Sequence, residues 1–414
     1  MRVLFLESYF KPEKTSGAHL AQDLRDALVD AGHTMQIFAP TPCRGISDEV
    51  RREYKKKRKE TECGGAVSIY RYPMFKEGRN SLLRAARYSL IEAALLWHGL
   101  TCKSADILPM GSTPPINGLM TTLIKKIRKI PFVYTVQDLF PDSLVSTGMT
   151  RRGSILWKIG DWVSNLTYKN AEHIIVISES LKESLVERGV PAEKVSVVYN
   201  WIDTEKTKPI ERENNTLFDE YGLSRDKFYI TYAGNLGNSQ NVDLVVDCAE
   251  AFKDNADIFF VIFGEGSEKQ RLEKRIIESG LENIKMLPMQ NQDRVSEVYS
   301  LGDASFVMCK KGVGGGAFPS KAASIMATAT PIIASFDLGS DLCKIIASEK
   351  VGLCIEPENT NEASEAVKKL YSDKLLREEL SANARKLAET KFSRAAGVSK
   401  RIEIYEKFAL KREK

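Results

Sequence analysis

Short runs of β-branched and aromatic residues alternate with longer stretches of helical periodicity along the whole chain. This alternation is typical of parallel sheets covered by helices. The strands predicted in the first half are Val3–Leu6, Met35–Phe38, Val67–Arg71, Ile107–Pro109, Phe132–Thr135, Ile174–Ile177 and Val195–Tyr199. The strands predicted in the second half are Tyr229–Tyr232, Ile258–Phe263, Ile284–Leu287, Ser305–Met308, Pro331–Ala334 and Leu353–Ile355. The pattern therefore predicts an α/β protein with two doubly wound domains.

Helical stretches and one polar segment organise these strands. The stretch His19–Ala31 places Leu20, Leu24 and Leu28 on one face and stops at Gly32, a residue typical of a helix end. Asp203–Asn215 is polar and includes a proline, so we expect it to be the hinge between the domains. Open α/β sheets bind ligands outside the carboxyl ends of their strands, so we expect the two domains to face an interdomain cleft.

Composition narrows the class of protein. The 414 residues are 43% hydrophobic and 28% charged, which excludes disordered and fibrous chains. The most apolar stretch, Tyr88–Leu100, is broken by Glu92 and His98, so we expect no membrane-spanning helix. The N-terminus has no signal-peptide pattern, and we expect a cytoplasmic protein. Seven scattered cysteines and 4 histidines predict reduced thiols and no metal site.

Charge is distributed unevenly along the chain. Residues 1–200 hold 29 Lys and Arg against 21 Asp and Glu, and the remainder holds 31 against 34. Much of the excess of positive charge lies in Arg51–Lys59. This run is either a solvated surface or a site for anionic lipid. No nucleic-acid-binding motif accompanies it, so we expect no nucleic acid as a partner. Ser81–Leu100 combines leucines and a tryptophan with Arg84 and Arg87, and is either a core helix or an interfacial one. We expect the first domain to dock on an anionic membrane surface through these two segments.

Three glycine-bearing loops follow predicted strands. Gly17 stands at the entry of the first long helix, where backbone N–H groups can approach an anion. The loops 233–238 and 263–268 contain G-x-x-G and G-x-G, without the dinucleotide fingerprint or the P-loop pattern. The second of these loops is either a ligand contact or an ordinary turn.

Candidate chemistry concentrates in residues 310–321. Three consecutive glycines precede Pro319, Ser320 and Lys321, and the small-residue helix 322–329 follows. Ser320 can cap that helix, and Lys321 lies in its first turn. The stretch is either a diphosphate site, which we expect, or a flexible surface loop. In the first half, Gln137 and Asp138 end a buried strand, where Asp138 either lines a cleft or caps the next segment.

Together these stretches resemble the retaining nucleotide-sugar glycosyltransferases of family 4, which have the GT-B fold of two Rossmann-like domains. The resemblance spans essentially the whole chain. It is carried by Gly17 before its helix, Val198–Asp203, Phe263–Gly266, and the Pro319–Lys321 motif followed by Pro331–Ser335. It implies an acceptor-binding domain at 1–202, a donor-binding domain at 203–385, and final helices at 386–414 that cross back to the first domain. Within the family the chain is most similar to the bacterial surface-polysaccharide branch that includes N-acetylfucosamine transferases.

The resemblance implies roles for individual residues. The donor-binding residues would be Gly17, Gly234, Asn235, Gly264, Glu265, Met289, Lys310, Gly315, Gly316, Pro319, Ser320, Lys321 and Ser324. Ser16 and His19 would bind the acceptor, and Asp138, Gln137 and Lys321 would be catalytic, with no metal or cofactor.

The chain departs from the family at several of these positions. The E-x7-E pattern is absent, with Ser324 in place of its second Glu and Gly316 near its first. The usual diphosphate-binding Arg and Lys fall near Asn235 and Gln240, and a frequent histidine falls at Gln137. We assign charge neutralisation to the cations that remain nearby, Lys321 and the pair Lys310 and Lys311.

The implied activity is retaining transfer of a sugar from a nucleoside-diphosphate donor, with a UDP-sugar expected, to a lipid-diphosphate-linked saccharide. Such a step belongs to the assembly of capsule, O-antigen or exopolysaccharide on the inner face of the cell membrane. Two alternatives remain open from the sequence. One is a nucleotide-sugar 2-epimerase of the same fold, and the other is a non-catalytic scaffold subunit of a polysaccharide assembly complex.

Overall fold

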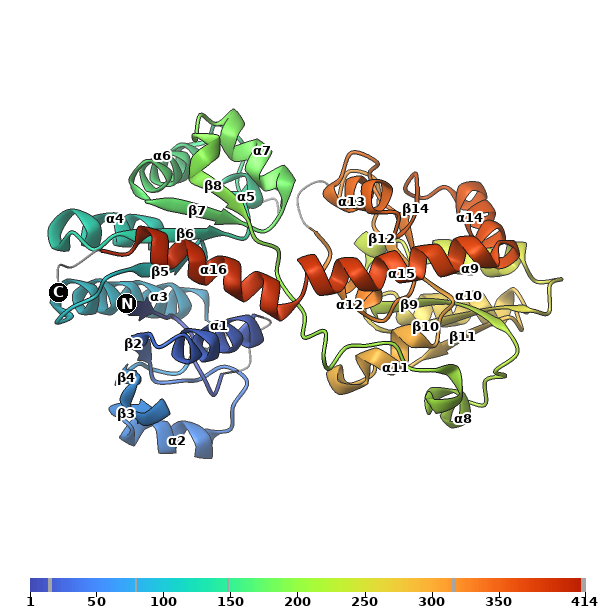
Figure 1. The fold of residues 1–414 in the computed structure, drawn as a ribbon, viewed down its shortest axis with the longest axis horizontal. Coiled ribbons are helices and arrows are strands. Elements are labelled where there is room, and N and C mark those ends of the chain that lie inside the picture. Colours follow the sequence, from blue (N-terminus) through green and yellow to red (C-terminus); the bar gives the residue numbers. More distant parts are fainter. Residues whose placement is uncertain (14–16, 79, 147–148, 315–317, 411–414) are drawn as a thin grey trace. The chain divides into compact units, whose positions relative to one another are not determined.

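The computed structural model describes residues 1–13, 17–78, 80–146, 149–314 and 318–410. The chain divides into two compact units (Figure 1). Unit 1 comprises Met1–Val198 together with Val398–Lys414, and unit 2 comprises Tyr199–Gly397. Each unit is a parallel α/β structure with its own buried core, as the sequence predicts.

Unit 1 is built on two four-stranded sheets that meet at a bridge between Val3 and Ile107. The strands are β1 (Arg2–Leu6), β2 (Thr34–Pro40), β3 (Lys59–Glu62), β4 (Val67–Tyr72), β5 (Leu108–Gly111), β6 (Phe132–Val136), β7 (His173–Val176) and β8 (Val195–Val197). Their orders are β1-β2-β4-β3 and β5-β6-β7-β8. All pairs are parallel except β3 with β4. β3 was not predicted, because its sequence Lys-Glu-Thr-Glu contains no apolar residue; charged side chains are typical of edge strands.

Helices connect the strands of unit 1. They are α1 (Ala18–Asp30), α2 (Asp48–Lys56), α3 (Ser81–Thr101), α4 (Asn117–Arg128), α5 (Asp142–Ser146), α6 (Ile155–Asn170) and α7 (Glu179–Glu187). The final helix α16 (Arg394–Phe408) begins in unit 2 and belongs to unit 1 from Val398 onward. The predicted end of α1 is confirmed, since Gly32 follows it with a φ of 77°. None of the helices in the described part of the chain is long and apolar enough to cross a membrane.

The last segment of the chain packs on the amino-terminal part of unit 1. His33 Nε2 lies 3.0 Å from Glu406 Oε1, and the backbone N–H of Leu410 donates to the Asp106 carbonyl at 2.8 Å. The Phe408 ring stacks on His173 with 4.9 Å between centroids. The end of α16 is therefore part of unit 1, although about 200 residues of unit 2 separate it from Val198.

Unit 2 contains one six-stranded parallel sheet in the order β11-β10-β9-β12-β13-β14. Its strands are β9 (Phe228–Asn235), β10 (Ile258–Glu265), β11 (Ile284–Leu287), β12 (Ala304–Met308), β13 (Ile332–Ser335) and β14 (Gly352–Ile355). Its helices are α8 (Leu217–Glu220), α9 (Asp243–Ala251), α10 (Lys269–Glu278), α11 (Val295–Ser300), α12 (Ser320–Ala327), α13 (Asp341–Glu349), α14 (Thr360–Ser372) and α15 (Lys374–Lys391). The central strands β9, β10 and β12 are buried along most of their length, which explains their continuous apolar runs.

The segment 203–215 is not a free hinge, and this interpretation of the sequence was wrong. The segment lies inside unit 2. The backbone N–H groups of Lys208 and Ile210 donate to Ser296 Oγ at 3.1 Å and Ser300 Oγ at 3.0 Å. Arg385 of α15 donates to the carbonyl oxygens of Thr204 and Thr207. The polar composition of the segment suggested a solvent-exposed linker. In the structure, its backbone N–H and carbonyl groups form hydrogen bonds with side chains rather than with water.

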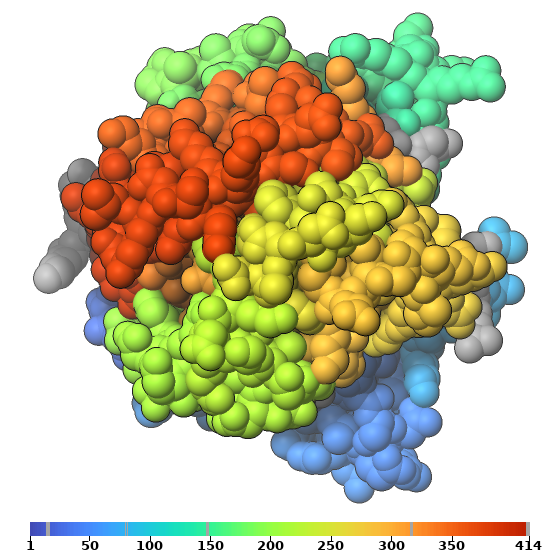
Figure 2. Space-filling model, turned by 90° about the vertical axis from the view of Figure 1, so that its right-hand side faces the viewer, coloured from blue at the N-terminus to red at the C-terminus, as the bar shows by residue number. Residues whose placement is uncertain are grey.

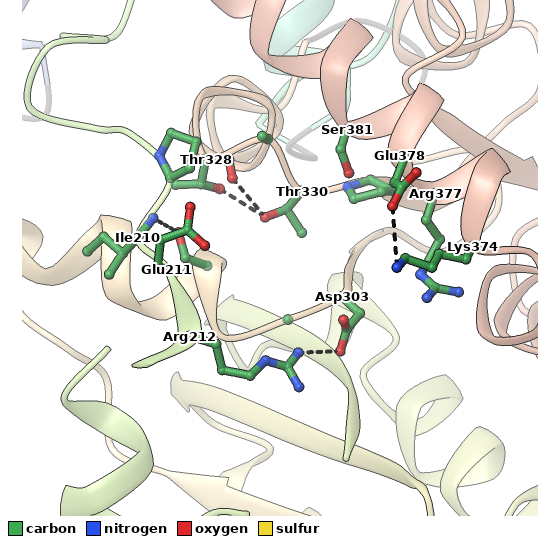
Figure 3. Close-up of a pocket in the computed structure, with 15 residues that line it drawn as sticks. Ile210, Glu211, Arg212, Asp303, Thr328, Thr330, Lys374, Arg377, Glu378 and Ser381 are labelled. Carbon is green, nitrogen blue, oxygen red and sulfur yellow. Dashed lines mark hydrogen bonds and ion pairs between the residues drawn. The ribbon is translucent and has the colours of Figure 1, made fainter. Parts of the chain in front are cut away.

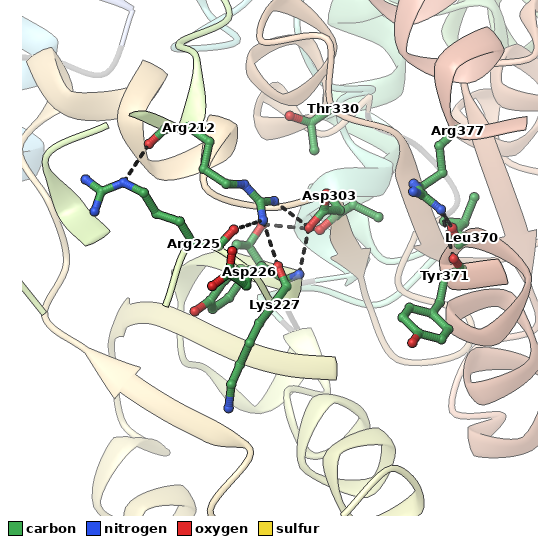
Figure 4. A network of polar contacts seen from close by, with 12 residues as sticks. Arg212, Arg225, Asp226, Lys227, Asp303, Thr330, Leu370, Tyr371 and Arg377 are labelled. Atoms are coloured by element: carbon green, nitrogen blue, oxygen red, sulfur yellow. Dashed lines mark hydrogen bonds and ion pairs between the residues drawn. The ribbon is translucent and has the colours of Figure 1, made fainter. Parts of the chain in front are cut away.

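Arg212 fastens the end of the same segment (Figure 4). Its guanidinium donates to the carbonyl oxygens of Arg225 at 3.0 Å and Lys227 at 2.7 Å, and to Asp303 Oδ2 at 2.7 Å. Asp303 also accepts the backbone N–H of Tyr229 at 2.8 Å. One side chain thus ties the segment to the start of the central strands β9 and β12.

Candidate functional site

The carboxyl ends of β9, β10, β12 and β13 lie along one edge of the unit 2 sheet, because all six strands run parallel. This edge is where open α/β sheets bind ligands. It gathers the loop after Asn235, the loop after Glu265, Lys310 and the start of α12. Most of the donor-binding residues predicted from the sequence belong to this edge.

Lys321 is the central side chain of the edge. Its ammonium lies 4.4 Å from the centroid of the Tyr232 ring and 3.4 Å from the Tyr232 hydroxyl. A Cβ atom on Gly234 would lie only 2.6 Å from Lys321 Nζ, so glycine makes room for the ammonium. Burial lowers the pKa of Lys321 from 10.5 to about 8. No carboxylate among the described residues forms an ion pair with this ammonium, which is the condition expected of a cation that awaits an anionic ligand.

The tight turn after β10 is explained by packing. A Cβ on Gly264 would lie 2.6 Å from the Gly234 carbonyl oxygen, and one on Gly266 would lie 2.4 Å from the Leu236 carbonyl oxygen. Both glycines therefore permit close approach to the loop after β9. The exposed Glu265 carboxylate pairs with Lys269 at 2.7 Å.

The loop after β9 brings several polar groups together. Lys310 Nζ donates to Asn238 Oδ1 at 2.6 Å, and the Lys310 backbone N–H donates to the Ser239 carbonyl at 2.9 Å. Asn235 Nδ2 donates to Gln240 Oε1 at 3.4 Å. The two amides that replace the family's usual cations thus contact each other, and Lys310 supplies a positive charge beside them.

The start of α12 differs from the expectation. Pro319 is the N-cap residue, and no side chain of the described residues caps this end, so the predicted cap by Ser320 was wrong. Ser320 is instead the first helical residue, Lys321 the second, and the half-buried Ser324 lies one turn later. The first turn holds no acidic residue, which leaves the positive end of the helix dipole without a compensating side chain there.

Other predicted donor residues lie further away or outside the described chain. Met289 follows β11, and 44% of its surface is exposed. Gly315 and Gly316, like Ser16 of the predicted acceptor site, lie outside the residues that the structure describes.

In unit 1 the predicted residues lie at the carboxyl ends of β6 and near the start of α1. The backbone N–H of Gln137 donates to Ser112 Oγ at 3.2 Å, and Asp138 is exposed. The next helix, α5, begins four residues later, at Asp142. Gly17 precedes α1 and His19 is exposed in its first turn; a Cβ on Gly17 would meet no atom within 4 Å.

A buried polar cluster in unit 1 was missed by sequence reasoning. Glu92 of α3 accepts a hydrogen bond from Ser8 Oγ at 3.4 Å, and burial raises its pKa to about 7. Arg87, which is fully buried, donates to the Phe75 carbonyl and to Cys43 Sγ. Burial also raises the pKa of Glu7, directly after β1, to about 7. The signal for Glu92 was present, since it interrupts the most apolar stretch of the chain.

A separate polar pocket of about 280 Å³ lies at the opposite edge of the unit 2 sheet (Figure 3). It is bordered by residues 209–212, by the turns before β12 and β13, and by the start of α15. Figure 2 shows this face of unit 2, with the segment that leads to α8 in green and α15 in red. Its charged side chains neutralise one another: Arg212 pairs with Asp303 at 2.7 Å and Lys374 with Glu378 at 3.7 Å. We therefore place the candidate site at the carboxyl edge.

Two doubly wound units in one chain are typical of the GT-B fold. The model "Glycosyltransferase Family 4" matches residues 17–206, and "Glycosyl transferases group 1" matches residues 213–387. The two matches together span most of the chain and identify it as a glycosyltransferase, with a family 4 domain followed by a group 1 domain.

Similar proteins agree with this assignment. The putative colanic acid biosynthesis glycosyl transferase WcaI of Escherichia coli K12 is 24% identical over 87% of this chain and 89% of its own length. The probable glycosyltransferase WbjE of Pseudomonas aeruginosa is 22% identical over 70% of this chain and 72% of its own. The crystal structure of Anabaena HepE with UDP is 15% identical, with a TM-score of 0.71 over 98% of this chain and 100% of that one, and supports the fold.

Proposed function

We propose that the protein transfers a sugar, with retention of anomeric configuration, from a UDP-sugar to a lipid-diphosphate-linked saccharide during assembly of a bacterial surface polysaccharide. The enclosed ammonium of Lys321 beside Gly234, which has no carboxylate partner within the described ranges, is the observation that carries the proposal. The colanic acid relative supports the polysaccharide context, and the UDP in the similar crystal structure supports the donor class. The branch that the sequence resembles includes N-acetylfucosamine transferases, so an N-acetylated deoxyhexose is the first sugar to test.

The donor diphosphate would bind at the carboxyl edge of unit 2. Lys321, the first turn of α12 and Lys310 would stabilise the negative charge that develops on the departing nucleotide. The backbone near Gly234, Asn235, Gly315 and Gly316 would approach the phosphates, and Pro319, Ser320 and Ser324 would line the same end of α12. Glu265, Gly264 and Met289 would contact the nucleotide side of the donor.

Unit 1 would hold the acceptor. Gln137 and Asp138 would orient the reacting hydroxyl, and Gly17, Ser16 and His19 would contact the acceptor or the transferred sugar. The departing phosphate itself would accept the hydroxyl proton, so this mechanism needs no dedicated protein base. The enzyme would act at the cytoplasmic face of the membrane, where its acceptor is anchored.

One assay tests the activity. The purified protein is incubated with a panel of UDP- and other nucleotide sugars, with and without a lipid-diphosphate saccharide, and products are separated by mass and stereochemistry. Acceptor-dependent transfer with retained configuration supports the proposal. Epimer release without acceptor would identify a 2-epimerase, whereas nucleotide binding without turnover across the panel would identify a scaffold subunit.

Asp138 has its own test. Asp138→Asn is expected to lower kcat for transfer at least about tenfold, because a charge-assisted hydrogen bond to the acceptor contributes about 1.5–3 kcal/mol. Its thermal unfolding should match the unmodified protein. A lower melting temperature with unchanged turnover of the folded fraction would show that Asp138 only stabilises its loop.

A further inference from the structure

The outward surface of α3 is an apolar stripe. Leu83, Leu90 and Trp97 follow one another at seven-residue spacing, so their side chains lie along one line of the helix. They are 56%, 53% and 65% exposed. A helix whose outer face is apolar leaves a large unsatisfied hydrophobic surface, which a water-facing helix avoids.

The neighbouring helices continue this surface. α4 packs against both α3 and α6. Ile127 of α4 is 62% exposed, and on α6 Ile155, Ile159 and Trp162 are 79%, 55% and 59% exposed. We call the set Leu83, Leu90, Trp97, Leu123, Ile127, Ile155, Ile159 and Trp162 the α3–α4–α6 face.

The charges on these helices are almost all positive. α3, α4 and α6 contain seven Lys and Arg against two acids, Glu92 and Asp161. Glu92 is buried, and Asp161 pairs with Arg188 at 3.4 Å. Among the described residues of the three helices no acid is exposed, whereas Arg84, Lys126 and Lys158 are exposed next to the apolar stripes.

We propose that the α3–α4–α6 face docks on an anionic lipid bilayer, with Trp97 and Trp162 inserted at the headgroup level. Tryptophan prefers that level because its ring is apolar and its N–H is polar. Exposed lysines and arginines without acids complement anionic headgroups. A second copy of the chain fits less well, because pairing two such faces would bring cations of equal sign together. The proposal rests on the proposed function to the extent that a lipid-anchored acceptor lies at this surface.

The basic run 51–59 contributes less to membrane binding than its sequence indicates. Lys57 pairs with Glu53 at 2.6 Å and Arg52 with Glu49 at 3.1 Å. Arg51 is buried and donates to backbone carbonyls of Pro42 and Met74. Several cations of α2 are therefore already compensated, which moves the docking surface from α2 to α3, α4 and α6.

Tryptophan fluorescence tests the docking without any substitution. The chain has four tryptophans, of which Trp201 is buried and Trp157 half-buried. Vesicles of phosphatidylglycerol and brominated phosphatidylcholine should quench the two exposed ones, and most of that quenching should disappear in Trp97→Phe with Trp162→Phe. Absence of quenching at saturating vesicle concentration would overturn the proposal.

Variants then locate the surface by vesicle co-sedimentation. Trp97→Ser with Trp162→Ser should weaken binding at least about tenfold, since each large side chain loses its buried apolar area. The matched control is Ile277→Ser with Leu375→Ser, residues of unit 2 that are 78% and 79% exposed, and binding should not change. Equal losses in both double variants would show non-specific adsorption and defeat the proposal.

Charge variants complete the test. Lys126→Ser with Lys158→Ser should weaken binding to anionic vesicles about fivefold per lysine, and Lys55→Ser with Lys56→Ser should change it less than twofold. Equal recovery on neutral and anionic vesicles, or a Trp97-dependent dimer in lipid-free ultracentrifugation, would contradict the bilayer as the occupant. No donor or acceptor is present in these assays, so their failure is distinguishable from failure of the transfer reaction.

Discussion

Lys321 carries a cost in stability that its proposed role in donor binding would explain. Its lowered pKa means that the folded protein holds this proton less tightly than the unfolded chain does. The penalty is therefore complete below about pH 8 and shrinks as the pH rises from 8 towards 10.5. No carboxylate of the described residues compensates this cost, which supports the proposal that Lys321 binds an anionic ligand.

We predict that Lys321→Met increases the free energy of unfolding at pH 7 by about 1–2 kcal/mol, after allowing for partial exposure of the side chain. The same change should lower kcat/KM for the donor at least about tenfold, because a charged contact to the diphosphate is lost. Urea unfolding at pH 7 and pH 10 together with donor kinetics checks both effects. Lys310→Met, which alters a half-buried lysine that is hydrogen-bonded to Asn238, serves as the comparison for stability. Unchanged kinetics with destabilisation would show that the ammonium is structural.

Glu92 predicts a pH dependence in unit 1. Its raised pKa means that the folded protein holds the proton more tightly than the unfolded chain, so its contribution to stability is complete below about pH 4.5 and is lost as the pH rises through about 7. Glu92→Gln should therefore raise the free energy of unfolding at pH 8 by about 1–3 kcal/mol and flatten the profile between pH 5 and 8.

Thermal unfolding across that pH range measures the effect of Glu92→Gln. Glu193→Gln, an exposed carboxylate of the same unit, is the control and should leave the profile unchanged. A variant whose stability falls at pH 8 would contradict the burial argument. Glu7 retains its own raised pKa, so some pH dependence should remain in Glu92→Gln.

Sequence reasoning found part of the candidate site. Lys321 and the glycines were visible because a charged residue in a first helical turn and repeated glycines are locally unusual. Tyr232 was not recognised as a site residue, because its contact with Lys321 joins residues that are 89 positions apart. The apolar strand around Tyr232 gave no local signal of that contact. The cap at Ser320 was wrong because the proline before it already sets the backbone for the helix start.

At the scale of elements, Arg212 makes several of the contacts that hold the end of the segment from 203 to α8. Arg212→Met should lower the free energy of unfolding of unit 2 by about 2–3 kcal/mol, because its hydrogen bonds to two carbonyls and Asp303 are lost together. Calorimetry of the full chain measures this.

Arg225→Met is the matched control for Arg212→Met. Arg225 pairs with Asp219, whose side chain is 75% exposed, and its Nε donates a longer hydrogen bond of 3.3 Å to the Arg212 carbonyl oxygen, so a much smaller loss of stability is expected. Equal destabilisation by both variants would show that the segment is held by the sum of its surface contacts and not by the Arg212 network.

The strands with apolar runs were predictable as elements, and their boundaries differ from the structure by a few residues. Elements without an apolar signal were not predictable from the sequence. β3 is an all-polar edge strand that forms because β4 offers free backbone groups, and the segment 203–215 is ordered by serines and arginines distant in sequence. Both depend on tertiary partners, which composition does not report.

At the scale of the whole molecule, the two units should respond separately to a nucleotide. We predict that UDP slows amide hydrogen exchange in unit 2 around residues 234–240 and the start of α12, and leaves α3 and α4 of unit 1 unchanged. The reason is that the proposed diphosphate contacts all lie in unit 2. Hydrogen exchange with mass spectrometry at saturating UDP provides the measurement, with uridine as the control that lacks the diphosphate. Protection confined to unit 1 would contradict the placement of the donor.

The two-domain α/β architecture followed from the repeated alternation of strands and helices, which each half of the chain shows independently. The return of α16 to unit 1 was implied by the family resemblance alone. The contacts of Glu406 with His33 and of Phe408 with His173 join residues that are far apart in the sequence. No local pattern in residues 394–410 identifies those partners.

That return affects how the protein is made. Unit 2 is one continuous stretch, Tyr199–Gly397, and can assemble as soon as it leaves the ribosome. The main part of unit 1 is synthesised before unit 2 and still lacks Ile404 and Tyr405, which are buried in the folded unit, until all of unit 2 has been translated. Because domains generally fold as units during synthesis, the first of the two units to emerge is completed after the second. A nascent chain stalled before α16 would expose the surface that this helix covers, and chaperones would meet the protein there.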